Sequence, residues 1–360
     1  MSTCAEQISE AIRQGRVIKD IVIDSENLDG HDFSGGVFAH VQFMDVSMRR
    51  VQLGDVVFNE CRFRGVDMLQ ADLSKCIFEK CHLDDVCLSE SLLHGCTMSS
   101  THAVGADFCG AHANGFNCVK CDLSACRFHD ARIESSVFSE TRLERADFTR
   151  AIVHKAVFYR LDLKETIFLE ATFNDAVFAE ASLVGQRLRG QQMFRCQFAG
   201  ADLRNVDFTA ANLARCNFQG AKLSGARLDG VDAPYAIFFE TDAHDVNCRH
   251  AALPDSIWVQ ADIRNVDFTG SKLNGAVLQR TRCNGSRFSQ TSLEGVDFSY
   301  ADLTEAEFDG ASFARTAFHG AIEPDIAWRE HPGAVECDPE LSEAQAWSRQ
   351  RDESSHRDDH

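Results

Sequence analysis

Fifteen cysteines and fourteen histidines are the residues of this 360-residue chain whose chemistry could hold a metal ion or form a disulfide. The densest group is Cys118, Cys121, Cys126 and His129, and its spacing is typical of a zinc site when taken by itself. Zinc requires ligands that converge in a tetrahedron. Whether these side chains converge depends on the secondary structure that positions them. A sequence repeat determines that secondary structure.

The chain repeats every five residues from Ile18 to Phe318. Each block has a small residue first, a residue that is usually polar second, and Phe or Leu third. Phe or Leu occupies 44 of the 61 third positions, and no insertion or deletion interrupts the count. A period of five matches neither a strand nor an α-helix. The repeat therefore has to be interpreted before any secondary structure is assigned.

The motifs Ala201-Asp202-Leu203 and Ala301-Asp302-Leu303 resemble the pentapeptide-repeat family, and the resemblance covers residues 17–320. It implies an all-β fold, a right-handed quadrilateral parallel β-helix with four pentapeptides in each coil. The first and third residues of a block would point inward and the other three would face solvent. About fifteen coils would then stack at strand spacing into a rod, with short helical caps at both ends.

We expect four segments along the chain. Residues 1–16 hold a capping helix, because Thr3 and Glu6 form a capping-box pair and Gly15 can end the helix. This helix is expected to cover the open edge of the first coil. The β-helix follows in residues 17–320, a C-terminal helical capping segment in residues 321–350, and a disordered tail in residues 351–360.

The repeat weakens in three stretches, residues 101–118, 186–193 and 231–256. Phe116 fills a small position in the first stretch, and Gln186 and Gln191 do so in the second. The third stretch contains two prolines and several small central residues. We interpret these stretches as local irregularity or bending, and a recognition site is the alternative.

The repeat register also predicts which cysteines point into the core. Eleven of the fifteen fall at inward positions, where free cysteine serves as a small apolar residue; they are Cys61, Cys76, Cys81, Cys96, Cys118, Cys121, Cys126, Cys196, Cys216, Cys248 and Cys283. We predict free thiols in a reducing cytoplasm. The zinc interpretation is disfavoured because its cysteines lie on successive faces and His129 points outward. No metal and no cofactor are expected.

The formal net charge is −19, and residues 321–360 contribute −7 of it. Direct binding to nucleic acid is disfavoured, because it needs clustered Lys and Arg. The acidic charge either keeps a long rod soluble or meets a basic partner. The outward Asp and His residues are expected to be solvated rungs of the coil.

One face breaks the rule that the second residue of a block is polar. Its second positions are mostly Val or Ile, and neighbouring outward positions add further apolar residues. The candidate protein-binding residues are Val137, Val157, Tyr159, Val177, Ile237, Phe239, Ile257, Val259 and Val277. An apolar stripe of this kind indicates an interface with a partner or a homodimer. The alternative is that β-branched residues simply suit a ladder-forming face.

The sequence contains no P-loop, no Rossmann glycine pattern and no nucleophile elbow, so we do not expect an enzyme. We predict a non-catalytic protein-binding scaffold, a rigid acidic rod. The family resemblance implies a bacterial effector or a secretion-accessory protein as one role. The alternative role that it implies is a DNA-mimicking protein that binds and protects gyrase, a type II topoisomerase. Neither a cleaved leader nor a membrane span is expected, and localisation is predicted to be cytoplasmic, with delivery by a secretion system left open.

Overall fold

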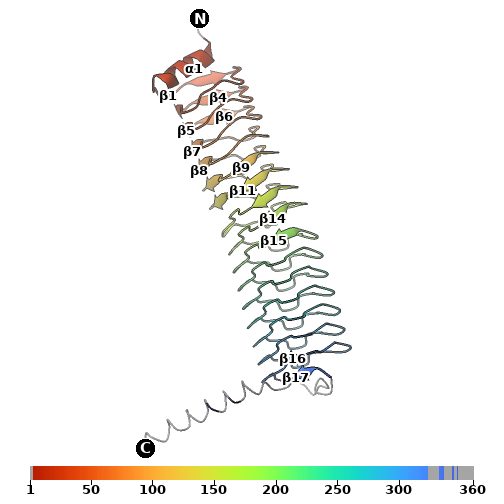
Figure 1. Cartoon of the computed structure of the whole chain (residues 1–360). Coiled ribbons are helices and arrows are strands. Elements are labelled where there is room, and N and C mark those ends of the chain that lie inside the picture. The colour runs from red at the N-terminus through yellow and green to blue at the C-terminus, as the bar shows by residue number, and fades with distance from the viewer. Residues whose placement is uncertain (1–2, 323–331, 336–342, 344–346, 348–360) are drawn as a thin grey trace, which may run out of the picture. The chain divides into compact units, whose positions relative to one another are not determined.

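Backbone pairing between residues twenty apart closes the chain into coils. In the computed structural model Phe38 pairs with Phe58, and Phe43 pairs with Phe63, both in parallel register. Isolated bridges continue the same offset of twenty residues from Asn27–Ser47 to Asp302–Ile322. Four pentapeptides therefore complete each coil (Figure 1). The fold is a parallel β-solenoid, which confirms the predicted fold class.

The structure describes residues 3–322, 332–335, 343 and 347. These residues divide into two compact units, Met1–Asn217 and Phe218–His360, and each unit is treated by itself below. The predicted C-terminal helical segment and tail lie almost entirely outside the described residues. The segment boundaries expected from the sequence therefore remain predictions.

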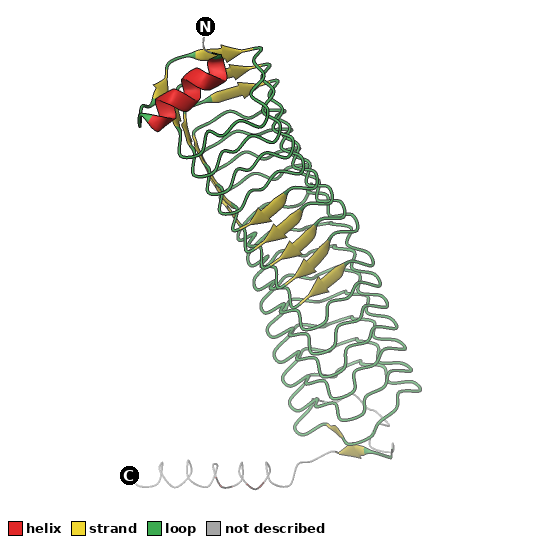
Figure 2. Ribbon diagram, turned by 45° about the horizontal axis from the view of Figure 1, so that its top comes forward, coloured by secondary structure: helices red, strands yellow, loops and turns green. Residues whose placement is uncertain are grey.

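The first unit begins with helix α1 (Cys4–Arg13) and contains three parallel sheets (Figure 2). The seven-stranded sheet consists of β1 (Ile18–Lys19), β3 (Val37–Ala39), β5 (Val57–Asn59), β7 (Ile77–Glu79), β8 (Thr97–Ser99), β10 (Asn117–Val119) and β12 (Val137–Ser139). The three-stranded sheet consists of β2 (Val22–Asp24), β4 (Gln42–Met44) and β6 (Arg62–Arg64). The five-stranded sheet consists of β9 (His112–Asn114), β11 (Arg132–Glu134), β13 (Ile152–His154), β14 (Thr172–Asn174) and β15 (Gln192–Phe194).

In the second unit the ladder consists mainly of single bridges, and one short pair is extended enough to count as strands. These are β16 (Thr316–Ala317) and β17 (Ala334–Val335), which pair in parallel. The bridges keep the twenty-residue offset, as in Ile237–Ile257 and Asp242–Asp262. The coil geometry is therefore the same in both units, although the strands differ in length.

Columns of inward side chains form the core. On the face centred on Phe138, the rings of Phe138 and Phe158 stack with centroids 5.1 Å apart and planes 4° apart. Ten residues further on, Phe128 and Phe148 stack at 4.7 Å. All four rings are at most 2% exposed. Parallel stacking follows from the coil repeat, because equal residues recur one strand spacing apart.

Helix α1 begins with the capping box predicted from the sequence. The Thr3 side chain accepts a hydrogen bond from the Glu6 backbone N–H, and the Glu6 carboxylate accepts one from the Thr3 N–H. Gly15 follows the helix with a φ of +64°, a left-handed conformation that favours glycine. Ala5 and Ile8 are buried, so the helix packs its apolar side on the first coil.

Many of the outward Asp residues are not the simple solvated rungs expected from the sequence. At most second positions of a block that hold Asp, the carboxylate folds back and accepts the backbone N–H two residues on. Examples are the 2.9 Å bond from Leu69 to Asp67 and the 2.9 Å bond from Thr269 to Asp267. The chain turns here, and the fifth residue of these blocks is left-handed, as Gln70 and Gly270 are. The carboxylate therefore stabilises the corner of the coil, which is the physical reason for Asp in the motif.

The three weak stretches do not interrupt the ladder. Phe116 is fully buried and packs against Phe108 and Phe138, with ring centroids 6.2 Å away in both cases. It fills space that small central residues leave, such as Ala113. Gln186 is also buried, and its amide donates to the carbonyls of Leu163 and Thr166. These residues satisfy the coil in another way, and the twenty-residue register continues through the stretches. Bending of the coil or recognition at these stretches stays a prediction.

We predict that acid destabilises the fold through the corner carboxylates. Burial raises the pKa of Asp302, but hydrogen bonds from Thr304 and Asn284 outweigh it, and the pKa lies below its ordinary value. The same balance lowers the pKa of Asp67, Asp147 and Asp267. Their contribution to the free energy of unfolding is complete above the unfolded pKa of about 3.9. It is lost as the pH falls through the lower pKa of the folded state.

Thermal unfolding followed by circular dichroism should show a nearly constant midpoint from neutral pH to about pH 5 and a steep fall below about pH 4. The matched control is the triple variant Asp147→Asn, Asp267→Asn and Asp302→Asn. Asn keeps the acceptor, as Asn212 does for the N–H of Ala214, but it does not titrate. The triple variant should lose less stability in acid. An equal loss in both proteins would contradict the role of the corners.

We predict that Phe116 and Ala113 compensate each other in volume. Phe116→Ala should lower the free energy of unfolding by about 3–5 kcal/mol, because a fully buried ring leaves a cavity. Adding Ala113→Leu restores the regular pattern of a small first residue and a large third residue. Denaturant unfolding should show the double variant to be more stable than Phe116→Ala alone. A double variant that is less stable than the single one would disprove the compensation.

Candidate protein-binding surface

Three valines of the first unit form a continuous outward ladder. Val137 bridges Val157, and Val157 bridges Val177, each in parallel register. All three side chains are half-buried, because each valine covers part of its neighbour one coil away. They stand beside the inward Phe138 and Phe158, at the second position of their blocks. The coil thus brings together residues that the sequence separates by twenty. We call Val137, Val157 and Val177 the valine ladder.

Tyr159 lies next to the valine ladder and is 41% exposed. Its hydroxyl donates to Glu180 Oε1 at 3.0 Å, and the Arg160 guanidinium lies 4.8 Å from the centre of its ring. Arg160 Nε also donates to Glu180 Oε2 at 2.7 Å. The hydrogen bond with Glu180 raises the pKa of Tyr159. The ring is therefore held in place at the edge of the ladder, a favourable property for an aromatic contact residue.

The second unit carries a similar ladder of Ile237, Ile257 and Val277, which we call the isoleucine ladder. Ile257 is 37% exposed, and the other two are half-buried. Phe239 and Val259, two residues after the isoleucines, are also half-buried. The predicted site residues therefore form two clusters, one in each unit. Their function as an interface is not decided by this placement.

The structure also exposes apolar residues that the sequence analysis missed. In the first unit Ile152 is 51% exposed, Phe194 36% and Leu169 62%. Ile152 and Phe194 line a shallow hollow of about 410 Å³ on the face of β13, β14 and β15. Phe194 stands outside the central register, so its position was a usable signal. Its clustering with Ile152 depends on the coil offset.

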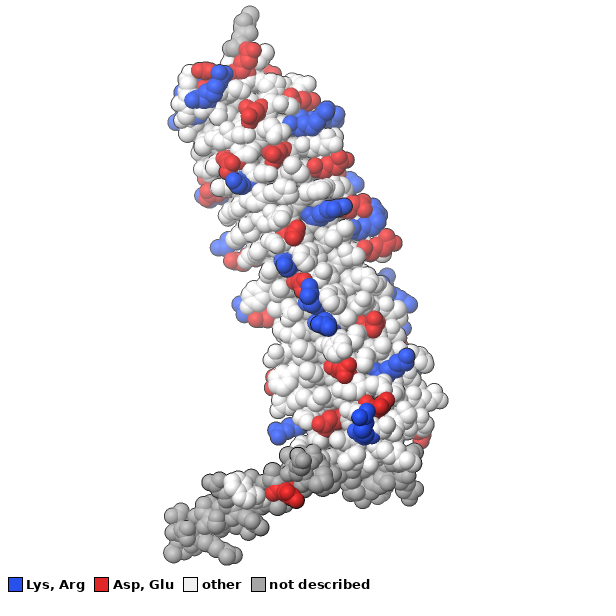
Figure 3. Space-filling model, in the orientation of Figure 1, with Lys and Arg blue, Asp and Glu red and all other residues white. Residues whose placement is uncertain are grey.

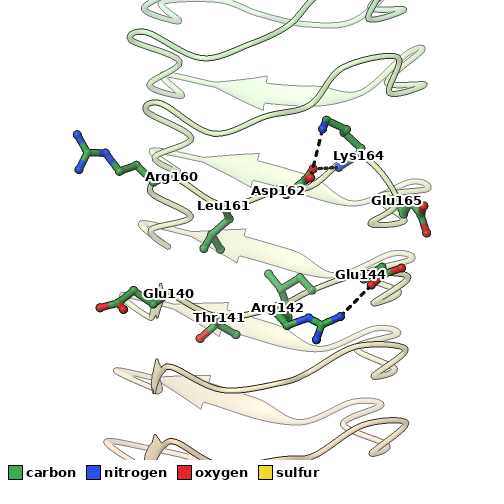
Figure 4. A pocket seen from close by; sticks show the side chains of 10 residues that line it. Glu140, Thr141, Arg142, Glu144, Arg160, Leu161, Asp162, Lys164 and Glu165 are labelled. Atoms are coloured by element: carbon green, nitrogen blue, oxygen red, sulfur yellow. Dashed lines mark hydrogen bonds and ion pairs between the residues drawn. The ribbon is translucent and has the colours of Figure 1, made fainter.

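A second hollow, of about 600 Å³, lies on the face centred on Leu143 (Figure 4). Its charges compensate one another. Arg142 pairs with Glu144 at 3.3 Å, and Lys164 pairs with Asp162 at 3.2 Å. Arg160, at its rim, pairs with Glu180. This hollow therefore offers mainly paired charges.

The cysteines of the zinc-like spacing do not converge. The Cys121 and Cys126 thiols are buried and donate to the carbonyls of Met98 and Ala103 in the preceding coil. His129 points outward, and its Nε2 lies 2.8 Å from Asp147 Oδ2. The eleven cysteines predicted to point inward are all buried. Burial raises the pKa of Cys283 to about 12, so this thiol stays protonated.

Within the described residues, Asp242, His244 and Asp262 form the one group of three side chains close enough to share a metal ion. Both oxygens of Asp262 are already engaged. Arg264 Nε donates to Oδ1 at 2.8 Å, and Arg282 donates to Oδ2 at 2.7 Å. The two guanidinium groups supply the positive charge that a metal would bring. We therefore interpret this group as an ion-pair network.

Positive and negative residues alternate over the surface. Figure 3 shows Lys and Arg interspersed with Asp and Glu on the face that it displays. Many of these residues pair across neighbouring coils, as Arg150 does with Asp130 at 2.6 Å and Arg195 with Asp175 at 2.7 Å. The net negative charge is thus spread over the coil. None of the helices in the described part of the chain has the length and apolar character needed to cross a membrane.

Comparison with family models identifies the class of protein. The model of pentapeptide repeats matches in eight copies, over residues 58–95, 91–130, 104–139, 126–160, 192–232, 244–280 and 286–322. These matches cover more than half of the chain, which belongs to the pentapeptide-repeat family. No curated protein matches the sequence.

Several solved structures are similar to this chain. Full-length QnrB1, a plasmid-mediated fluoroquinolone resistance protein, is 19% identical, covers 57% of this chain and 92% of its own, and has a TM-score of 0.33. HetL from Nostoc sp. strain PCC 7120, which is involved in the regulation of heterocyst differentiation, is also 19% identical. It covers 90% of this chain and 98% of its own, with a TM-score of 0.19.

We predict that the stacked cysteines remain free thiols. Cys76 and Cys96 lie twenty residues apart at inward positions, as do Cys61 and Cys81, and Cys196 and Cys216. Burial raises the pKa of both Cys76 and Cys96, which disfavours the reactive thiolate. In the native protein Cys76 and Cys96 should therefore react slowly with an alkylating reagent.

After unfolding without reductant, mass spectrometry should find every cysteine alkylated. A parallel sample that is reduced first serves as the control and should give the same number of labels. A peptide pair joined through Cys61 and Cys81 in the unreduced sample would contradict the prediction.

Proposed function

We propose that the chain is a non-catalytic scaffold that binds protein partners through the valine and isoleucine ladders. The observation that supports the proposal is that Val or Ile recurs in direct register where other faces present polar residues, as in Val137–Val157–Val177. A polar or charged residue at these positions would serve the coil equally well, since Asp, Asn, Gln and Arg occupy the second position elsewhere. Apolar side chains beside water are better explained by a partner that covers them.

The energy available from such a contact is sufficient for a specific complex. Full burial of a Val or Ile side chain contributes roughly 1.5–3 kcal/mol, and these half-buried residues would each gain a part of that. Tyr159 and Phe239 add aromatic area next to the two ladders. Several such residues together offset the entropy lost on association, which small contacts do not. Either a partner protein or a second copy of this chain could bury this apolar surface.

The site chemistry supports binding over catalysis. Burial keeps the Cys283 thiol protonated, and the Asp residues of the corners accept hydrogen bonds from their own turns. The hollow near Leu143 contains paired charges. Many buried free thiols also suit a reducing compartment such as the cytoplasm. The partner's identity, including whether it belongs to a secretion system, is left to experiment.

The alternative proposed role is a DNA mimic that binds a type II topoisomerase. A net charge of −19 suits a basic DNA-binding groove. The ion pairs across coils reduce the negative charge that such a groove would meet. We therefore prefer the apolar ladders as the binding surface. The same experiment separates the two roles, because a topoisomerase would be identified among the bound proteins.

We predict that Val157→Asp combined with Ile257→Asp abolishes partner binding or self-association. The substitution places a charge in the middle of each ladder, while both residues face outward and leave the core intact. The matched control is Asn212→Asp with Ala252→Asp. These two residues also occupy outward second positions, one in each unit, but on a different face. Both variants add the same charge.

Sedimentation velocity would measure the oligomeric state, and affinity capture from a bacterial lysate would recover partners. The wild type and the control should retain the same oligomer or the same captured protein, and the ladder variant should lose it. If all three proteins show the same oligomeric state and capture the same proteins, the ladders reflect only the β-propensity of Val and Ile. Capture of gyrase by all three proteins would favour the alternative role.

A further inference from the structure

The first coil has an unpaired backbone edge. β1 and β2 stand at the outer ends of the seven-stranded and three-stranded sheets. In later coils the second residue of a block donates its N–H to the coil before it, as Gln42 does to Ile21 and Arg62 does to Val41. Val22 occupies the equivalent place in the first coil. Val22 lies opposite Gln42, and the Gln42 N–H donates to the Ile21 carbonyl. In a parallel ladder of this register the N–H and C=O of Val22 itself point away from the solenoid.

Helix α1 covers the core side chains of the first coil but leaves the segment around Ile21 and Val22, which we call the rim, exposed to solvent. Leu28 and Phe33 of the first coil are at most 1% exposed, and the Ile12 side chain reaches Gly36. In contrast Ile21 is 42% exposed and Val22 is 59% exposed. Figure 2 shows α1 lying across only part of the first coil. The helix was expected to cover the open edge, and this expectation holds for the core but not for β2.

Ile21 shows most clearly how the first coil differs in exposure from later coils. It occupies the first, inward position of its block, where Val41 and Cys61 in the next two coils are fully buried. Ile21 remains exposed because it has no coil on its other side. An apolar inward residue beside an unpaired strand is the arrangement that an added strand would complete.

A groove of about 800 Å³ runs between α1 and this rim. Its apolar lining comes from Ile8 and Ala11 of the helix and from Val17, Ile18 and Ile21 of the first coil. The groove includes both residues of β1 and extends to Ile21, the residue directly before β2. It therefore offers apolar contacts for a side chain next to backbone groups for a strand.

The charge of the groove lining is positive on balance, because Arg13, Arg16 and Lys19 outnumber Glu6 and Glu10. Glu6 accepts the capping-box hydrogen bond, and Glu10 bonds Arg13 and Gln14. Arg16 and Lys19 also line the groove, and neither makes an ion pair with a residue in the described part of the chain. A carboxylate near Arg16 and Lys19 would complement them. The groove thus selects an acidic ligand within a chain that is itself strongly acidic.

We propose that this groove and the free edge of β2 bind an extended acidic peptide segment of a partner protein by addition of a β-strand. The peptide backbone pairs with the N–H and C=O of Val22. One apolar side chain of the peptide covers Ile21, and an acidic side chain faces Arg16 and Lys19. This site is separate from the valine and isoleucine ladders, so either can fail without the other.

The experiment begins by selecting ligands from a random twelve-residue peptide display library on the full chain. Val22→Pro is the counter-selection target. Proline removes the outward N–H, which has no bond within the described solenoid, and it fits an edge strand. The matched control Val22→Thr keeps the N–H and the branched shape. Circular dichroism and thermal midpoints would verify that both variants fold.

Fluorescence anisotropy with a labelled selected peptide then measures affinity. We expect an apolar and acidic consensus, and a loss of about tenfold or more for Val22→Pro, as expected for a lost backbone hydrogen bond. Val22→Thr should retain most of the affinity. Arg16→Glu with Lys19→Glu should weaken binding through charge repulsion, while the Val157→Asp and Ile257→Asp variant should bind normally.

A second measurement does not depend on any protein variant. The selected peptide is synthesised with N-methyl groups on alternate residues, which prevents strand pairing, and is tested on the wild-type chain. Binding should be lost. The proposal is overturned if no peptide is enriched, if Val22→Pro binds as tightly as the wild type, or if the N-methylated peptide binds equally well.

Discussion

Parallel backbone pairing at an offset of twenty residues is the constraint on which the rest of this structure depends. It places equivalent residues one strand spacing apart, so every column contains one kind of position. Phe138 then meets Phe158, Cys76 meets Cys96, and Val137 meets Val157. Stability is distributed along the columns, because each coil contacts mainly its neighbours. A residue that breaks the pattern, such as Phe116, persists where adjacent positions leave it space.

The acidic residues have two roles, and some residues have both. Asp67 and Asp267 bind the backbone of their own turns through Oδ1 and an arginine of the preceding coil through Oδ2. Asp130 and Asp175 pair with arginines one coil away. The ion pairs offset negative charge that would otherwise act at a distance. The surface is therefore less of a uniform acidic field than the net charge indicates, and an apolar ladder is better suited to give a specific contact.

The two proposed surfaces follow from the two ways in which a solenoid can bind. Along its side, outward columns repeat one residue type and build a ladder. At its end, the regular pairing stops and leaves backbone groups open, as at Val22. Helix α1 covers only the core of this end, since Leu28 and Phe33 are buried while Ile21 stays exposed. A side surface selects its partner by shape and apolar area, whereas the end selects it by strand geometry and charge.

The period of five by itself determined the solenoid, the inward cysteines and the outward place of Val157 and Ile257, because the pattern states which side of the backbone each residue occupies. The capping box at Thr3 and Glu6 was equally predictable from the sequence, since both residues lie within one helical turn. Only the tertiary structure showed that Asp carboxylates fold back on their turns and that Phe194 clusters with Ile152. It alone showed that Ile21 is exposed at an inward position. These features depend on which coil lies above or below a residue, and contacts across twenty residues or at a chain end are not encoded in any single block.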